Sequence, residues 1–137
     1  AVDLLCEGKS VSVETLQAMD ECKTGALIRA AAKMGCILAG ADRKRVTAAD
    51  GYAKALGFAF QIEDDILDVE GDAAALGKPV GSDAGSQKST YVSLLGIERA
   101  RRAVGELTDA AVTALGAFGE RGARLAGLAR RLARRER

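Results

Sequence analysis

The sequence predicts an all-α protein, and three observations support this. Alanine, leucine, arginine and glutamate are abundant, aromatic residues make up 4% of the 137 residues, and there is one proline, Pro79. Such a composition favours long helices over sheet. No segment shows the alternating pattern and turn that indicate a β-hairpin. We expect about six helices, which form one domain or one part of a domain.

The first two expected helices differ in character. Ser12 is placed to cap a short helix that ends near Cys22, because a serine hydroxyl accepts hydrogen bonds from free first-turn amides. Residues 24–41 follow with only two charged side chains, Arg29 and Lys33, which lie four positions apart and share one helical face. That pattern predicts a largely buried helix.

A long helix is expected in the centre of the chain. Residues 42–45 form a charged break, and residues 46–71 then carry small and apolar side chains through their middle. Residues 71–89 lose the helical period and gather glycines, serines and Pro79, which predicts a loop.

The C-terminal part is predicted to be helical as well. Residues 91–95 form a short apolar segment that ends at Gly96. An amphipathic helix is expected over residues 97–118, and an arginine-rich helix follows Gly119 and Gly122.

The central helix carries a stripe of carboxylates. At 100° per residue, Gln61, Asp64, Asp65, Asp68 and Asp72 fall within an arc of about 100°. Like charges four positions apart repel by roughly 0.2–0.5 kcal/mol, so the stripe calls for a cation. Ligation by oxygen alone favours Mg²⁺, whose remaining ligands come from water and phosphate, and this implies a phosphorylated substrate. An isolated DDxxD is most often a solvated acidic face. The apolar flanks GFAFQI and IL instead indicate a mostly buried helix.

The same residues resemble a known family. FQIEDDILDVEGD, followed by ALGKPVGSD and QKSTYVSLLG, is similar to the second aspartate-rich region of trans-isoprenyl diphosphate synthases of the farnesyl and geranylgeranyl type. KTGALIRAA resembles the lysine-threonine motif of that family, and AVDL resembles the end of its GQxxDL segment. The resemblance runs in order from residue 1 to about residue 96, whereas the arginine-rich end fits loosely.

The resemblance implies an activity and a cofactor. In this family an allylic diphosphate ionises with the help of Mg²⁺, isopentenyl diphosphate attacks the carbocation, and a proton is lost. The product is a prenyl diphosphate that is five carbons longer. We therefore expect a prenyltransferase of the short-chain class, built on an all-α bundle and usually homodimeric.

The resemblance also implies the site residues. The metal ligands are Asp64, Asp65 and Asp68. The expected contacts of the diphosphates and the rim of the site are Lys23, Lys78, Lys88 and Asp83. The residues expected near the developing carbocation are Thr24 and Gln61, which with Lys23 form the catalytic set.

Four further side chains are assigned no role in the site. Lys44 and Lys54 belong to no motif and are expected on the surface. Phe58 and Phe60 are interpreted as ordinary core rather than as the lining of a prenyl tunnel.

The first aspartate-rich motif of the family does not occur in these 137 residues. We therefore expect the C-terminal part of a single polyprenyl synthase domain, with little or no activity by itself. The missing N-terminal half, or another chain, should then cover the apolar helix at residues 24–41. The alternative is a non-catalytic prenyl-diphosphate-binding or regulatory-subunit-like protein, and a terpene cyclase is a weaker third possibility.

Composition argues against several other classes. Twenty basic and nineteen acidic residues nearly cancel, which does not favour nucleic-acid binding. No apolar run reaches the roughly 20 residues of a membrane span. Three cysteines without any histidine do not suggest a zinc site, and free thiols favour a cytoplasmic location.

Overall fold

The computed structural model describes the backbone of residues 12–76 and 89–134 and the side chains of residues 12–71 and 89–134. Each element in this part is a helix, which confirms the all-α prediction. Four of the helices, α3, α4, α6 and α7, have ten residues or more, against about six helices expected. The elements in chain order are α2 (Val13–Asp20), η1 (Glu21–Gly25), α3 (Ala26–Leu38), α4 (Arg43–Leu76), α5 (Tyr91–Leu95), α6 (Ile97–Ala114), η2 (Leu115–Gly122) and α7 (Ala123–Leu132).

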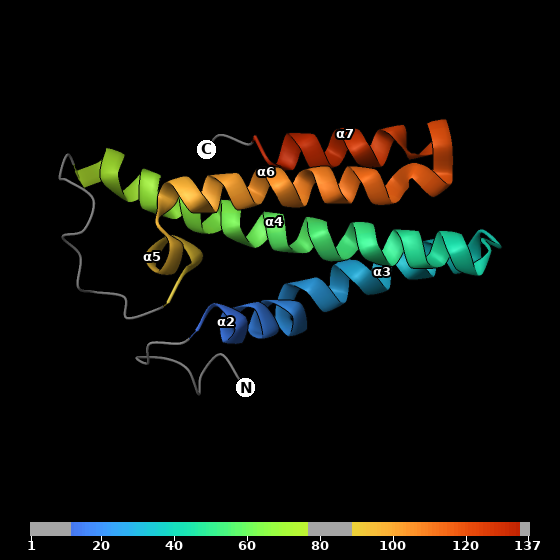
Figure 1. Cartoon of the computed structure of the whole chain (residues 1–137), viewed down its shortest axis with the longest axis horizontal. Coiled ribbons are helices and arrows are strands. Elements are labelled where there is room, and N and C mark those ends of the chain that lie inside the picture. Colours follow the sequence, from blue (N-terminus) through green and yellow to red (C-terminus); the bar gives the residue numbers. More distant parts are fainter. Residues whose placement is uncertain (1–11, 77–88, 135–137) are drawn as a thin grey trace.

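Helices α2 and α3 form one bent rod along one side of the molecule (Figure 1). Ser12 caps α2 as predicted, because its Oγ accepts a hydrogen bond from the Thr15 N–H at 3.3 Å. The break expected near Cys22 is wrong. The backbone stays helical and widens into a π-helical turn, η1, before it continues into α3. A π turn often marks a functional site in a helix.

The predicted burial of α3 is also wrong for this chain. No residue of α3 is buried, and apart from the half-buried Ile28 its large apolar side chains are exposed, from Met34 at 56% to Leu38 at 88%. The helix packs against α4 on one side. No other helix of the described part covers its opposite face, on which Leu27 and Ile37 also lie exposed.

Helix α4 runs through the centre of the structure and is longer than expected (Figure 1). The charged segment before it is a helix start, because Asp42 Oδ1 accepts from the Arg45 N–H at 2.8 Å. Beyond Gly71 the helix continues to Leu76, so the loop predicted from residue 71 begins too early. Alanine is the best helix former, and the three alanines after Asp72 explain the extension.

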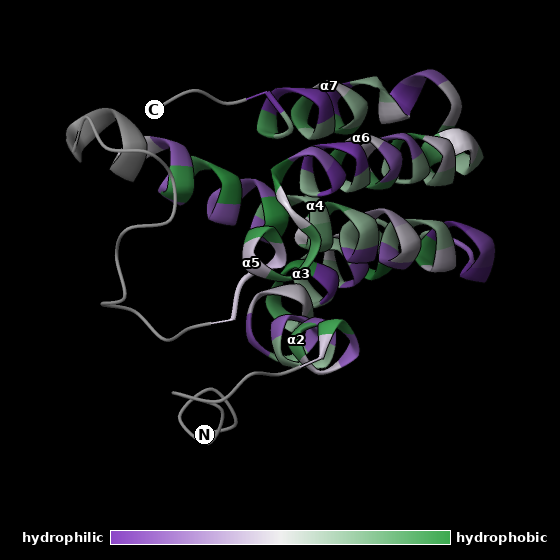
Figure 2. Cartoon of the chain, turned by 60° about the vertical axis from the view of Figure 1, so that its left-hand side comes forward, coloured by the Kyte–Doolittle hydropathy of each residue, from purple (hydrophilic) through white to green (hydrophobic). Residues whose placement is uncertain are grey.

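Two apolar clusters lie along α4. The first joins α4 to the hairpin of α6 and α7, and its buried residues are Tyr52, Ala53, Leu56, Ala111, Leu115, Ala126 and Ala129. The second joins α4 to α2, α5 and α6, and its buried residues are Leu16, Ile62, Ile66, Tyr91, Ala100 and Val104. Figure 2 shows green, apolar segments along the middle of α4 and purple, polar turns on the outside of α6 and α7. The predicted burial of the middle of α4 is confirmed.

The C-terminal elements follow the predicted order. Thr90 caps α5 through Ser93, and Gly96 ends the helix with a φ of 80°, which favours glycine. Helix α6 ends at Ala114, earlier than expected, because the chain tightens into the 3₁₀ turn η2. Gly119 turns the chain back toward α7 with a φ of 57°. Among the described residues, no helix combines the length and apolar character needed to cross a membrane.

Candidate functional site

The predicted metal-binding carboxylates lie on the second half of α4. The helix is continuous through residues 61–68, so Gln61, Asp64, Asp65 and Asp68 leave neighbouring sides of it, as the helical period predicts. Asp64 and Asp65 are half-buried, whereas Asp68 is exposed. The stripe therefore extends from the packed part of the molecule toward solvent.

Asp65 has a structural partner that the sequence did not predict. Its Oδ2 accepts a hydrogen bond of 2.9 Å from the backbone N–H of Tyr91, the first residue of α5. Burial raises the pKa of Asp65 to about 6, and the negative charges of Asp20 and Asp68 also raise it. The hydrogen bonds from the Tyr91 N–H and the Gln61 side chain act in the opposite direction. At neutral pH Asp65 is therefore a carboxylate held in a partly apolar setting.

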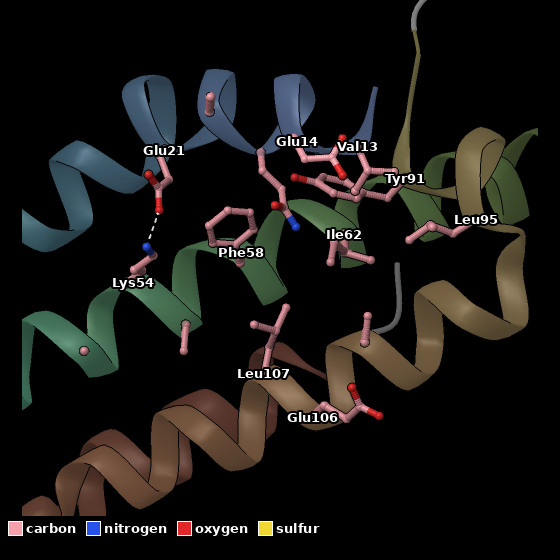
Figure 3. A pocket seen from close by; sticks show the side chains of 15 residues that line it. Val13, Glu14, Glu21, Lys54, Phe58, Ile62, Tyr91, Leu95, Glu106 and Leu107 are labelled. Atoms are coloured by element: carbon pink, nitrogen blue, oxygen red, sulfur yellow. Dashed lines mark ion pairs between the residues drawn. The ribbon is translucent and has the colours of Figure 1, made fainter. Parts of the chain in front are cut away.

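Tyr91 connects this carboxylate to the end of α2. Its side chain is 1% exposed, and it extends from α5 toward α2 (Figure 3). Burial raises the pKa of the Tyr91 phenol, and the neighbouring Asp20 carboxylate raises it further. The phenol thus stays protonated next to Asp20. Asp20 is the last residue of α2 and leads directly into the π turn.

The π turn η1, which contains Lys23 and Thr24, packs against α4. Gly25 is buried at this contact, and a Cβ built on Gly57 of α4 would lie 3.4 Å from the Gly25 Cα. The backbones of η1 and α4 thus approach to a distance that leaves space for at most a small side chain at position 57. Gly57 precedes Gln61 by one helical turn on the same face of α4. The turn that contains the lysine-threonine motif thus packs against the helix that bears the carboxylate stripe.

Lys78, Asp83 and Lys88 lie outside the described residues, and so does the side chain of Asp72. For the described part, the site consists of residues from η1 and α4. Lys23 is exposed there, and Thr24 and Gln61 are half-buried.

A groove of about 680 Å³ lies between α2, α4 and α6 (Figure 3), and none of the predicted site residues whose side chains are described lines it. Phe58 and Ile62 of α4 and Leu107 of α6 form its apolar wall, and both phenylalanines of α4 are half-buried. At one end the Lys54 Nζ forms an ion pair of 2.7 Å with the Glu21 carboxylate. Lys54 is on the surface as predicted, but it pairs with the residue that opens the π turn.

Sequence reasoning missed Asp20, Glu21 and Tyr91. A signal for each was present, because Asp20 and Glu21 lie just before the KTG motif and Tyr91 is part of QKSTYVSLLG. The sequence alone does not show that these segments lie close together in the folded chain. They are brought together by the packing of α2, α4 and α5 around the second apolar cluster.

The acidic residues fit one kind of metal site and not another. Among the described residues, no group of three or more His, Cys, Asp and Glu side chains lies close enough to hold a metal ion. A metal site made of protein ligands alone is therefore not present in that part. Mg²⁺ commonly takes one or two carboxylates and completes its shell with water and phosphate oxygens. The oxygen donors on α4 fit this second arrangement.

Residues 1–115 match the family model described as polyprenyl synthetase. The chain belongs to this family. Its relatives include the farnesyl diphosphate synthase of Escherichia coli, which is 49% identical over 110 residues, with 80% of this chain and 37% of the relative aligned. The geranylgeranyl diphosphate synthase of Cyanophora paradoxa is 46% identical over 98 residues, with 71% of this chain and 33% of the relative aligned.

The fold of the polyprenyl synthetase chain agrees with solved structures. A crystal structure of a decaprenyl diphosphate synthase from Rhodobacter capsulatus superposes with a TM-score of 0.83 at 26% identity, covering 99% of this chain and 55% of that one. The resemblance stated from the motifs is thereby confirmed. The chain spans well under half the length of the curated relatives described above.

Proposed function

We propose that this chain is part of a prenyltransferase that condenses an allylic diphosphate with isopentenyl diphosphate and makes a short-chain product of the farnesyl or geranylgeranyl class. The observation that carries the proposal is the packing of η1, with Lys23 and Thr24, against the helix that bears the carboxylate stripe. Membership of the polyprenyl synthetase family and the names of the relatives support the same activity.

The hard step of this reaction is the ionisation of the allylic diphosphate. The bond between the allylic carbon and the diphosphate oxygen breaks, which leaves a carbocation and pyrophosphate. Mg²⁺ held through Asp64 and its neighbours on the stripe would stabilise the negative charge that develops on the leaving group. The Lys23 ammonium, a compact and movable positive charge, would bind the diphosphate oxygens. We expect Lys78, Lys88 and Asp83 to complete this part of the site.

The carbocation and the new bond need a different environment. We expect the Thr24 and Gln61 dipoles to lie near the developing positive charge, and a dry site strengthens such interactions. The double bond of isopentenyl diphosphate then attacks the carbocation, and a proton is lost from the resulting tertiary cation.

We further propose that turnover needs residues beyond these 137. The family has a second wall of carboxylates on an earlier helix, and the present sequence contains one paired-aspartate motif. The apolar face of α3, with Leu27 and Leu38 exposed, has no cover in the described part and suits the packing of further helices. A homodimer of the whole protein, in the cytoplasm, remains our expectation.

The test is complementation in trans. The chain is co-expressed with the N-terminal segment of the Escherichia coli farnesyl diphosphate synthase that its match does not cover. Co-purification shows whether the two parts assemble, and incorporation of labelled isopentenyl diphosphate into product shows turnover. We expect Mg²⁺-dependent product formation, and a loss of about 100-fold or more in Asp64→Ala. Asp109→Ala, a change at an exposed aspartate of α6, is the matched control and should retain activity.

The results separate the two classes of function. An assembled complex that binds Mg²⁺ and pyrophosphate but forms no product would favour the non-catalytic binding protein. Full activity in Asp64→Ala would contradict the assignment of Asp64 as a metal ligand. If the two parts do not assemble, the same measurements are made on the Escherichia coli farnesyl diphosphate synthase after its aligned segment has been replaced by this chain.

A further inference from the structure

The charges of this chain are divided unevenly along the sequence. Residues 121–137 contain seven arginines and one glutamate, a net charge of +6, whereas residues 1–120 contain 13 basic and 18 acidic residues, a net charge of −5. The near-neutral total therefore combines an acidic part with one strongly basic segment. The centre of this segment forms α7, which packs on α6, η2 and α4 along one edge of the structure (Figure 1).

Four arginines form one exposed surface on α7 and in the turn that follows it. At 100° per residue, those of the helix itself point within an arc of about 120°. The buried Ala126 and Ala129 lie outside this arc and belong to the first apolar cluster. We use the name arginine face for these exposed residues: Arg124, Arg130, Arg131 and Arg134.

The arginine face has no carboxylate that neutralises it. Residues 121–135 include no acidic residue. Within the described part of the chain, none of the four guanidinium groups forms an ion pair, whereas Arg29, Arg45 and Arg101 each pair with a carboxylate. A charged group is costly to bury without a partner. This face is therefore suited to water or to an anionic partner, and not to the packing of apolar helices.

Further parts of the protein are expected to leave the arginine face free. Helix α3, whose exposed apolar side chains suit the packing of further helices, lies on the opposite side of α4 from α7 (Figure 1). Helices that cover α3 would thus extend the structure away from α7. The arginine face would then remain on the outer surface of the whole protein.

The residues around the arginine face favour a membrane over a nucleic acid as the partner. Leu125 is 42% exposed and Leu128 is half-buried, and in projection both lie beside Arg124. A basic helix with accessible leucines next to its charges is typical of binding to the headgroup region of an anionic bilayer. Nucleic-acid sites commonly add amides or aromatic rings that contact bases, and α7 contains neither.

We propose that the arginine face of α7 binds the surface of a membrane that contains anionic phospholipids. The arginines supply electrostatic attraction, and Leu125 contacts the boundary between headgroups and acyl chains. The attachment is peripheral, and it does not depend on the proposed activity. If the chain does belong to a prenyltransferase, attachment would release the amphiphilic product beside the bilayer.

The experiment uses the co-purified complex described above, or the chimera with the Escherichia coli protein if the parts do not assemble. Binding is measured by co-sedimentation with vesicles of phosphatidylcholine, alone or with about 30% phosphatidylglycerol, at about 0.1 M and about 0.5 M NaCl. The test variant combines Arg124→Gln with Arg131→Gln. The matched control combines Arg43→Gln with Lys44→Gln, which removes the same charge from exposed side chains at the start of α4.

The wild type should bind the anionic vesicles about tenfold more tightly than the neutral ones or better, and most of this binding should be lost at the higher salt concentration. The glutamine pair on α7 should weaken binding about tenfold or more, and the control pair about twofold or less. Arg124→Lys with Arg131→Lys keeps the charge, so binding should stay within about threefold of the wild type. Circular dichroism checks the folding of each variant, and glutamine and lysine are both good helix formers.

Two results would overturn the proposal. If the glutamine pair on α7 binds anionic vesicles as tightly as the wild type, the arginine face is not the contact. If the wild type binds a mixed-sequence nucleic-acid duplex more tightly than it binds the vesicles, and the same arginines are needed, the partner is a nucleic acid. A wild type that binds vesicles but forms no product would contradict the proposed function alone, because vesicle binding is measured without substrates.

Discussion

Arg29 on α3 binds Asp50 on α4 with two hydrogen bonds of 2.8 Å, one from Nε to Oδ1 and one from Nη2 to Oδ2. This bidentate ion pair, called the fork below, is a polar link between α4 and a helix that has no buried side chain. The hydrogen bond from Arg29 lowers the pKa of Asp50, and the same pair raises the pKa of Arg29. The ion pair therefore helps to hold α3 in place on α4.

Removal of this fork should destabilise the fold modestly. The side chains are 34% and 27% exposed, so solvent screens the pair, and we expect Asp50→Asn to cost about 1 kcal/mol of unfolding free energy. A lowered pKa means that the contribution is present above the ordinary value near 3.8 and is lost at lower pH. Urea unfolding at pH 7 and at pH 3 measures both effects. An equal cost at the two values would contradict the assignment.

The hydrogen bond from Tyr52 to α7 offers a second test. The Tyr52 hydroxyl donates to the Leu125 carbonyl at 3.0 Å and so joins α4 to α7. Tyr52→Phe keeps the ring in the first apolar cluster and removes one hydrogen bond, which should cost about 1 kcal/mol. The cost is measured as a change in the urea midpoint of unfolding, with the m-value unchanged. Hydrogen exchange should rise in α7 more than in α2, and a uniform rise would speak against a local link.

The contact of Gly57 with Gly25 should be sensitive to side-chain size. A Cβ at Gly57 meets the Gly25 Cα at 3.4 Å and Ile28 Cδ1 at 3.6 Å, which are ordinary contact distances. Gly57→Ala should therefore be tolerated and gain up to about 1 kcal/mol of helix propensity. Gly57→Leu has no space and should cost roughly 1–3 kcal/mol. Thermal unfolding compares the two variants.

A control for Gly57→Leu exists on α6. Gly105 is exposed, and a Cβ built there meets no atom within 4 Å. Gly105→Leu should therefore raise stability slightly or leave it unchanged. If Gly57→Leu behaves in the same way, the close approach of η1 and α4 is not tight.

Asp65 should give the metal-free protein an unusual pH dependence. Its pKa is raised to about 6 from an ordinary value of 3.8, chiefly by burial, so the folded state binds the proton more tightly than the unfolded state. The free energy of unfolding should then fall as the pH rises from about 4 to about 6, by on the order of 1–3 kcal/mol, and stay level above. Urea unfolding of the protein in EDTA, repeated at several pH values between about 4 and about 8, measures this pH dependence. Asp65→Asn should flatten the curve, and an unchanged slope in that variant would contradict the assignment.

Local signals in the sequence were sufficient for most helix ends. The Ser12 cap and the end of α5 at Gly96 depend on chemistry within a few residues, and both were predicted. The burial of the middle of α4 was predicted as well, because a helical segment made of small and apolar residues is most stable when it is buried. The π turn was missed, because a change from one hydrogen-bond spacing to the next has no composition of its own.

Contacts between distant segments were not predictable in the same way. The apolar residues of α3 indicated that a face would be covered, but not which segment would cover it, and in this chain Leu38 is 88% exposed. The carboxylate stripe was found from its period, whereas the partner of Asp65 was not, because Tyr91 is 26 positions away in sequence. The meeting of Asp20 with Tyr91 likewise depends on the packing of α2 against α5.

The length of α4 has a consequence for how variants of this protein will combine. Tyr52 and Asp65 lie on the same helix but in different apolar surroundings, and 13 residues at 1.5 Å place them roughly 20 Å apart. Energetic effects at such a separation usually add without coupling. Tyr52→Phe combined with Asp65→Ala should thus cost the sum of the single changes. Stability changes at the α6–α7 end and at the carboxylate end should then be additive, so substitutions at one end can be chosen without regard to those at the other.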